Sequence, residues 1–276
     1  SIVGSVKDVI TSYATIDSRV KFSIRSKNGN ISEASNTALN LVTGDYVALL
    51  DHDDLLSKHA LFFICEAINH HRDGKIYYSD EDKIDKHGHR FAPHFKSDWN
   101  LDLFYSQNYV SHLTVYQKRL LDRVHGFRVG VEGAQDQDLL LRCLPHIDSN
   151  QIIHVPRILY HWRAIDGSTA KQSSEKIYTS EAGLKSLRDY FQKENPDVAV
   201  QLGALPNTYR LTWPIPKPEP KVSLAIPTRD KLHLLKNCVK SILEKTTYGN
   251  YEIIIIDNGS VEKETIRYLE SISKKE

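Results

Sequence analysis

The sequence has no methionine, three cysteines and no large excess of charge of either sign. Its formal net charge of +1 lacks the basic surplus that nucleic-acid binding usually needs, so we expect no nucleic-acid partner. No apolar run approaches the roughly 18 residues of a membrane-spanning helix, and no secretory signal opens the chain. The missing methionine and the initial Ser1 indicate an excerpt of a longer protein.

The cysteines, Cys65, Cys143 and Cys238, lie far apart in the sequence, each within an apolar pattern typical of a helix. We interpret them as buried thiols of a reducing compartment rather than as disulfide partners or metal ligands. This favours a cytoplasmic protein, with at most a peripheral association with the inner face of the cell membrane.

Helical and strand patterns alternate along a chain with 40% hydrophobic and 26% charged residues, which is ordinary for a globular protein. Such alternation predicts an α/β layered fold. The expected helices contain Val6–Tyr13, Asn30–Leu41, Leu61–Ile68, Leu139–Leu144, Ile177–Phe191, Leu235–Ile242 and Ile266–Ile272. The expected strands are Val20–Ile24, Tyr46–Leu50, Lys75–Tyr78, Ile152–Val155, Val222–Ile226 and Tyr251–Ile256. The continuous apolar run Tyr46–Leu50 predicts a strand buried on both faces of a parallel sheet.

Proline occupies every second position from Pro214 to Pro220, which excludes helix and central strand and predicts a stiff extended linker. We therefore expect a first domain over residues 1–213, a linker over 214–220 and a further unit over 221–276. That last unit has the strand-helix-strand order with which nucleotide-binding sheets usually begin.

Asp51-His52-Asp53-Asp54 directly follows the strand that ends at Leu50. Ligands of open α/β sheets bind beyond the carboxyl ends of strands, and Asp51 and Asp53 share one side of an extended chain. Two such carboxylates suit a hard divalent cation that bridges a diphosphate. The same spacing recurs in Asp80-Glu81-Asp82 and Asp136-Gln137-Asp138, so spacing alone favours a solvated acidic turn or a helix cap. For Asp51 and Asp53, the position after a buried strand makes a metal site an equal alternative.

His161-Trp162-Arg163 follows a strand that ends near Tyr160. The arginine could clamp a phosphate and the tryptophan could stack on a sugar or base, while the alternative is a core tryptophan beside a surface arginine. The sequence contains no G-x-x-x-x-G-K-[ST] loop, no G-x-S-x-G elbow and no cysteine-pair metal motif.

Several short segments, in order along the chain, resemble motifs of the family 2 glycosyltransferases of the GT-A fold. They are Asn28-Gly29 with Ala34 and Asn36, Ala48–Asp54, Tyr78–Lys83, Ser106–Tyr109, Gln135–Leu139 and Pro156–Arg163. The opening of the same family then appears at Val222–Asp230 and Asp257–Ser260. The chain is similar to the tandem-domain enzymes that build bacterial O-antigen and other surface polysaccharides. This resemblance covers nearly the whole chain and implies a Rossmann-like mixed sheet with flanking helices.

The resemblance also implies roles for individual residues. Asp51 and Asp53 would form the D-x-D motif that holds Mn²⁺ or Mg²⁺ and the nucleotide diphosphate, and Asp136 would be the general base. The base stands in Gln-Asp, where the family usually has Glu-Asp. The residues expected at the nucleotide base and ribose are Pro227, Thr228, Asp257 and Asn258. The acceptor or phosphate candidates are Trp99, Asn100, Asn108, His112, His161, Trp162 and Arg163.

The chain departs from the family's pattern in two places. Many relatives have a histidine two residues after the arginine of the late motif, where this chain has Ile165, and His161 is the alternative candidate. The first domain also lacks the strand-helix-strand opening, which stands instead at 222–276. We hypothesise that Val222–Glu276 fills this slot as a circular permutant, by folding back or by exchange between chains. The seven residues Pro214–Pro220 reach at most roughly 23 Å, which restricts folding back within one chain.

The function implied is an inverting transfer of a sugar from a nucleoside-diphosphate sugar to a hydroxyl of a growing glycan. Such a transfer needs a carboxylate to take the acceptor's proton and a cation to absorb charge on the leaving diphosphate. The expected partners are the donor, a glycan or lipid-linked glycan acceptor, and the rest of a tandem glycosyltransferase chain. The alternatives are a metal-dependent nucleotidyltransferase and a non-catalytic saccharide-binding or scaffold module of a polysaccharide synthase.

Overall fold

The computed structural model describes residues 5–164 and 173–272. It divides the chain into two compact units, Ser1–Trp213 and Pro214–Glu276. Within the described ranges, no helix combines the length and the apolar character that crossing a membrane demands.

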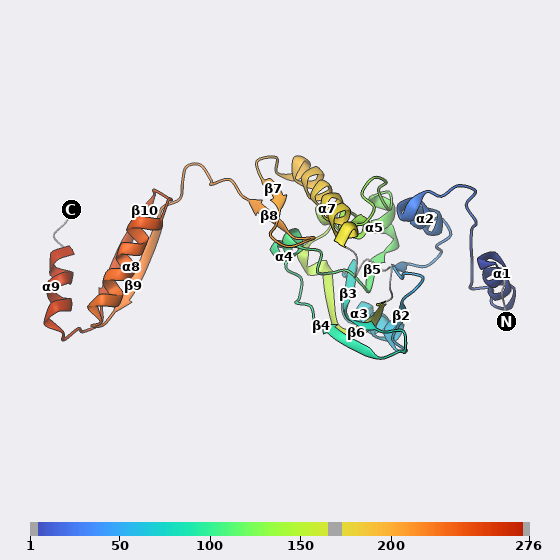
Figure 1. The fold of residues 1–276 in the computed structure, drawn as a ribbon, viewed down its shortest axis with the longest axis horizontal. Coiled ribbons are helices and arrows are strands. Elements are labelled where there is room, and N and C mark those ends of the chain that lie inside the picture. The colour runs from blue at the N-terminus through green and yellow to red at the C-terminus, as the bar shows by residue number, and fades with distance from the viewer. Residues whose placement is uncertain (1–4, 165–172, 273–276) are drawn as a thin grey trace. The chain divides into compact units, whose positions relative to one another are not determined.

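The first unit is built on a mixed six-stranded sheet (Figure 1). Its strands, in spatial order, are β1 (Tyr46–Ala48), β5 (Thr114–Gln117), β3 (Ile76–Ile84), β6 (Ile152–Arg163) and β2 (Leu55–Leu56), with β4 (Arg90–His94) paired to β3. The pair β3–β6 is parallel, and the other pairs are antiparallel. The two long parallel strands form the centre of the sheet, and β1 lies at one edge.

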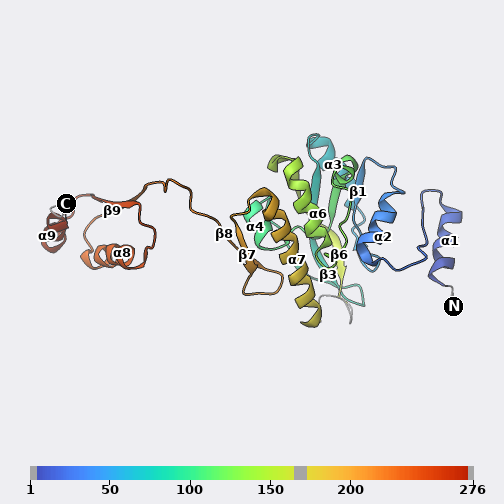
Figure 2. The same ribbon diagram turned by 90° about the horizontal axis from the view of Figure 1, so that it is seen from above.

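Helices cover both faces of this sheet because successive residues of β3 point in opposite directions. Ile76 and Tyr78 join one core cluster with α6 (Gln135–Cys143) and α7 (Ser173–Glu194). Tyr77 joins a second cluster, which includes Ala60 and Ile64 of α3 (Ala60–His70). Figure 2 shows α6 and α7 side by side. The predicted α/β layered class is confirmed.

The remaining elements of the first unit surround this core. They are α1 (Val6–Ile16), α2 (Asn30–Leu39), α4 (Leu101–Ser106), α5 (Lys118–Arg123), two short 3-10 turns (Leu144–His146 and Ser149–Gln151), and a small antiparallel sheet of β7 (Ala199–Leu202) and β8 (Tyr209–Thr212). Asn36 of α2 explains one of the sequence motifs. Its side-chain amide donates to the carbonyl of Phe127 at 2.8 Å and accepts the N–H of the same residue at 2.7 Å, which fixes α2 to the loop before α6.

The second unit has the strand-helix-strand order expected from its sequence. It consists of β9 (Val222–Thr228), α8 (Leu232–Lys245), β10 (Tyr251–Asp257) and α9 (Lys263–Ile272). β9 and β10 run parallel and pair along their whole length. With two strands, each is an edge strand, and Ile254 and Ile256 are exposed.

Three expectations about these elements are wrong. The strand at Tyr46–Leu50 is shorter, pairs antiparallel with β5 at the sheet edge and is not buried on both faces. Val20–Ile24 forms no strand in the described structure. A strand needs a neighbouring strand for its ladder hydrogen bonds, and none of the described strands pairs with this segment. Cys143 is buried, but Cys65 and Cys238 are exposed because they face outward from α3 and α8.

Candidate active site

The acidic turn after β1 is fastened to β6 by the third of its aspartates. The hydroxyl of Tyr160 donates to Asp54 Oδ2 at 2.5 Å, and the N–H of Arg163 donates to Asp54 Oδ1 at 2.7 Å. Asp54 is buried, whereas the side chains of Asp51 and Asp53 are 43% and 35% exposed. The turn therefore presents two accessible carboxylates on a support that the buried one holds in place.

Asp136, in the first turn of α6, lies within electrostatic reach of this turn. The pKa of Asp51 is raised above its ordinary value, first by burial and then by the negative charges of Asp54, Asp53 and Asp136, while His112 opposes the shift. Two segments far apart in the sequence thus contribute carboxylates whose charges act on Asp51. Negative charge gathered in this way is what a cation or a transferable proton would relieve.

Two acceptor-side candidates contact these carboxylates directly. The amide of Asn108 donates to Asp136 Oδ2 at 2.7 Å. His112 Nε2 lies 3.6 Å from Asp51 Oδ2, and its ring stacks on Tyr160 with centroids 4.7 Å apart. Trp162 meets the same histidine ring edge-on at 5.5 Å. Asn108 and His112 therefore lie next to Asp136 and Asp51, and Trp162 lies next to His112.

Trp99 and Asn100 have structural contacts instead. The Trp99 ring packs against Phe104 and Tyr109, and its indole nitrogen is buried without a hydrogen-bond partner in the described part of the chain. Asn100 caps α4 by accepting the N–H of Leu103 at 2.9 Å.

The late motif lies on β6 beside the site. His161 is buried, with Nδ1 2.6 Å from Asp82 Oδ1 on β3. The Nε of Arg163 donates to the backbone carbonyl of Asp53 at 2.6 Å, and this hydrogen bond helps to fix the acidic turn. Ile165, where many relatives have a histidine, lies outside the described residues.

The four nucleotide candidates meet at the carboxyl ends of the two strands in the second unit. Pro227 pairs in register with Ile256, and Thr228 with Asp257. The N–H of Asn258 donates to the carbonyl of Thr228 at 2.8 Å. Asp257 also accepts the N–H of Ser260 at 3.1 Å, which closes the loop after β10.

Sequence reasoning missed the role of the triplet on β3. Asp80 Oδ1 lies 2.8 Å from His154 Nε2, and Asp82 Oδ2 lies 2.6 Å from Arg90 Nε. Glu81, which points to the other side, pairs with Lys96 at 3.2 Å. Three consecutive acids inside a strand could have indicated this role. Buried charges are normally paired, so such acids predict basic partners close by.

No cluster of three or more histidine, cysteine, aspartate or glutamate side chains is placed to hold a metal within the described residues. Mg²⁺-type sites at diphosphates use one or two carboxylates, with phosphate oxygens and waters as the other ligands. The pair Asp51 and Asp53, set in a region of accumulated negative charge, fits that smaller donor set.

The sequence model of "Glycosyl transferase family 2" matches residues 4–125 and 223–276. The chain belongs to this glycosyltransferase family. The match spans both the acidic turn after β1 and the strand-helix-strand unit at the end of the chain. The family and the GT-A fold class that the motifs implied are confirmed.

Two longer proteins and one solved structure are similar to the chain. The chain is 46% identical over 265 residues to the protein y4gI of Sinorhizobium fredii, covering 96% of this chain and 29% of that protein. It is 34% identical over 262 residues to the O-antigen biosynthesis protein RfbC of Myxococcus xanthus, covering 95% of this chain and 20% of that protein. The solved structure of S. aureus TarS 1–349 with UDP is 16% identical, with a TM-score of 0.47, over 70% of this chain and 59% of that one. The chain thus spans less than a third of the length of the two sequence relatives.

Proposed function

We propose that the chain is an inverting glycosyltransferase module that moves a sugar from a nucleoside-diphosphate sugar to a hydroxyl of a growing surface glycan. The observation that supports the proposal is that Asn108 donates to Asp136 at 2.7 Å, while His112, four residues further on, lies 3.6 Å from Asp51. Membership of the family and the likeness to an O-antigen biosynthesis protein support the transfer and the glycan acceptor. We also propose that the module acts in the cytoplasm, where nucleotide sugars would reach it.

In this mechanism Asp136 is the general base. Its carboxylate takes the proton of the acceptor hydroxyl as that oxygen attacks the anomeric carbon and the bond from that carbon to the diphosphate breaks. Attack from the face opposite the leaving group inverts the anomeric configuration. Asn108 fixes one oxygen of Asp136 at 2.7 Å and so orients the carboxylate toward the incoming hydroxyl.

Asp51 and Asp53 are the residues that would hold a divalent cation, Mn²⁺ or Mg²⁺. When bound, such an ion neutralises the negative charge that develops on the departing diphosphate. Asp54 and Arg163 hold the turn that carries both carboxylates. They therefore influence donor binding by positioning Asp51 and Asp53.

The nucleotide base and ribose are assigned to Pro227, Thr228, Asp257 and Asn258. These residues share one end of the β9–β10 pair. Among the described residues β1 has an unpaired edge, where a strand-helix-strand unit of this kind would pair. Residues 221–276 would complete the first unit from the same chain or from a second one.

The deciding experiment compares Asp136→Asn with Asp53→Ala. Release of UDP or GDP from a panel of nucleotide sugars measures turnover, and thermal stabilisation by UDP or GDP with Mn²⁺ measures donor binding. Asp136→Asn should lower turnover by about 10²–10⁴-fold and leave stabilisation unchanged, since general-base catalysis contributes a factor of that size. Asp53→Ala should abolish the Mn²⁺-dependent stabilisation. Substantial turnover by Asp136→Asn would show that this carboxylate is not the base.

A further inference from the structure

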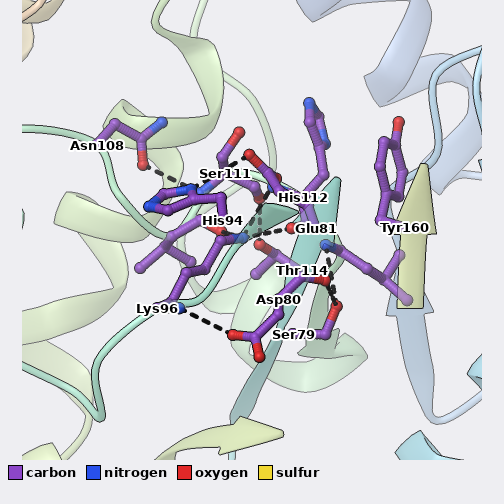
Figure 3. Close-up of polar contacts among 12 residues, drawn as sticks. Ser79, Asp80, Glu81, His94, Lys96, Asn108, Ser111, His112, Thr114 and Tyr160 are labelled. Atoms are coloured by element: carbon purple, nitrogen blue, oxygen red, sulfur yellow. Dashed lines mark hydrogen bonds and ion pairs between the residues drawn. The ribbon is translucent and has the colours of Figure 1, made fainter. Parts of the chain in front are cut away.

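Lys96 is a fully buried cation. Its ammonium group bonds to Glu81 and to the backbone of the segment Val110–His112. Its side chain is 0% exposed. Nζ lies 3.2 Å from Glu81 Oε2, 2.7 Å from the carbonyl oxygen of Val110 and 2.5 Å from that of His112 (Figure 3). A protonated lysine has three N–H donors, and these contacts use all of them. Burying such a charge is costly unless it is fully paired, so the arrangement needs an explanation beyond packing.

Glu81 also binds the backbone of His112. Its Oε2 accepts the backbone N–H of His112 at 3.2 Å, and its Oε1 lies 3.6 Å from His94 Nδ1. The N–H of His112 is therefore held by Glu81 and the carbonyl of the same residue by Lys96. Burial alone would raise the pKa of Glu81, but the hydrogen bond of His94 and the charges of Lys96 and His112 hold it below its ordinary value.

The clamped segment joins the two sides of the carboxylate site. Asn108 at its start holds Asp136, and His112 at its end faces Asp51. Between them Ser111 has φ of 39°, in the left-handed region that non-glycine residues rarely adopt. Such a conformation persists only where neighbouring contacts impose it, and the clamp supplies those contacts.

We propose that Lys96 and Glu81 are positioning residues that lock the segment Asn108–His112, and through it set Asp136 relative to Asp51. This deepens the proposed function and rests on it. Neither residue touches substrate; each acts through the backbone of the segment. Lys96 and Glu81 hold the segment Asn108–His112 rigid, and this segment then fixes the distance between the proposed base and the donor-binding carboxylates.

The test uses Glu81→Gln, which keeps the shape of the side chain, and the double substitution Glu81→Met with Lys96→Met. The double variant removes both charges together, so neither charge is left buried without its partner. Lys185→Met, at an exposed lysine of α7, is the matched control. Thermal unfolding confirms that each variant is folded before it is assayed.

Two readouts are expected to move together. Amide hydrogen exchange across residues 107–114 should speed up at least about tenfold in both clamp variants and stay unchanged in the control. Release of UDP or GDP from the nucleotide-sugar panel should fall about 10²-fold in kcat, because a misplacement of about 1 Å can cost that much. Stabilisation by the nucleotides with Mn²⁺ should change less than about threefold in apparent Kd, as the turn after β1 carries Asp51 and Asp53.

The outcomes separate this proposal from the proposed function. Unchanged exchange in folded clamp variants, or kcat within about threefold of the unsubstituted protein, would overturn the positioning role. Absence of any sugar transfer by the unsubstituted protein, with exchange still accelerated in the variants, would overturn the proposed function and leave the clamp as a purely structural device.

Discussion

Asp138 lies two residues after Asp136 on α6, and its side chain is 2% exposed between two guanidinium groups. Arg128 Nη2 is 2.6 Å and Arg142 Nε 2.7 Å from its two oxygens. Arg142 also donates to the carbonyls of Val124 and Gly126, so the network fastens α6 to the loop before it. The triplet Asp136-Gln137-Asp138 therefore contains a partly exposed aspartate, which we propose as the base, and a buried one with a structural role.

Asp138→Asn should lower the free energy of unfolding by about 2 kcal/mol, because the partly buried Arg128 and Arg142 both lose a charged hydrogen-bond partner. Urea denaturation measures the change. Asp122→Asn is the control: Asp122 pairs with Lys118 on the surface, and that loss should cost less than about 0.5 kcal/mol. A loss of less than about 1 kcal/mol for Asp138→Asn would contradict the buried network.

The three thiols should differ sharply in reactivity. Burial raises the pKa of Cys143 to about 12, whereas Cys65 and Cys238 are exposed. Because the thiolate is the reactive form, two thiols of the native protein should react with a disulfide reagent at pH 8 within minutes. The third should react after addition of guanidinium chloride. Reaction of all three under native conditions would show that the α6 core opens readily.

At the scale of elements, the strand pair β3–β4 carries a pH-dependent contribution to stability through Glu81. Its pKa in the folded protein lies below the unfolded value of about 4.3. The stabilisation from the ionised carboxylate is therefore complete above that unfolded value and is lost as the pH falls through the folded one.

The difference in unfolding free energy between the unsubstituted protein and Glu81→Gln should persist at pH 5 to 7. It should narrow below about pH 4, where protonated glutamate resembles glutamine. Urea titrations at each pH measure it. A difference that grows on acidification would mean that the carboxylate is not held ionised by Lys96 and its neighbours.

The elements themselves were largely predictable. Local periodicity marked α3, α6, α7 and the β9–α8–β10 unit because each has an apolar stripe or run of its own. The failures at Tyr46–Leu50 and Val20–Ile24 concern pairing, which depends on what lies beside a strand rather than on its own residues. The extension of β3 through Asp80-Glu81-Asp82 was missed for a related reason, since those acids are compatible with a strand only through Lys96, His154, His161 and Arg90.

The candidate site was predictable only in part, because its contacts also join residues that are far apart in the sequence. Asp51, Asp53 and Asp136 were identified through family motifs, and their spacing alone did not distinguish them from caps. Asn108 was predicted for the acceptor, but its amide contacts Asp136, a long-range contact that no local pattern encodes. Asp54 and Tyr160 were missed because their hydrogen bond joins positions 106 residues apart.

At the scale of the whole molecule, the proposal assigns metal binding to the first unit and nucleotide recognition to the second. Asp257→Ala should then weaken stabilisation by UDP or GDP with Mn²⁺, as we also expect of Asp53→Ala, although the two residues belong to different units. The seven-residue proline linker, with a reach of at most roughly 23 Å, makes exchange between chains an alternative to closure within one.

Mixing the two single variants distinguishes these routes. If units are exchanged between chains, a mixed dimer of Asp53→Ala and Asp257→Ala contains one site with both substitutions and one with neither. Unfolding and refolding the mixture should then restore nucleotide-dependent stabilisation in part of the protein, whereas closure within one chain predicts no recovery. Light scattering on the same sample reports whether dimers are present. Full nucleotide binding by Asp257→Ala alone would instead remove the second unit from the site, and the open edge of β1 would then need a different partner.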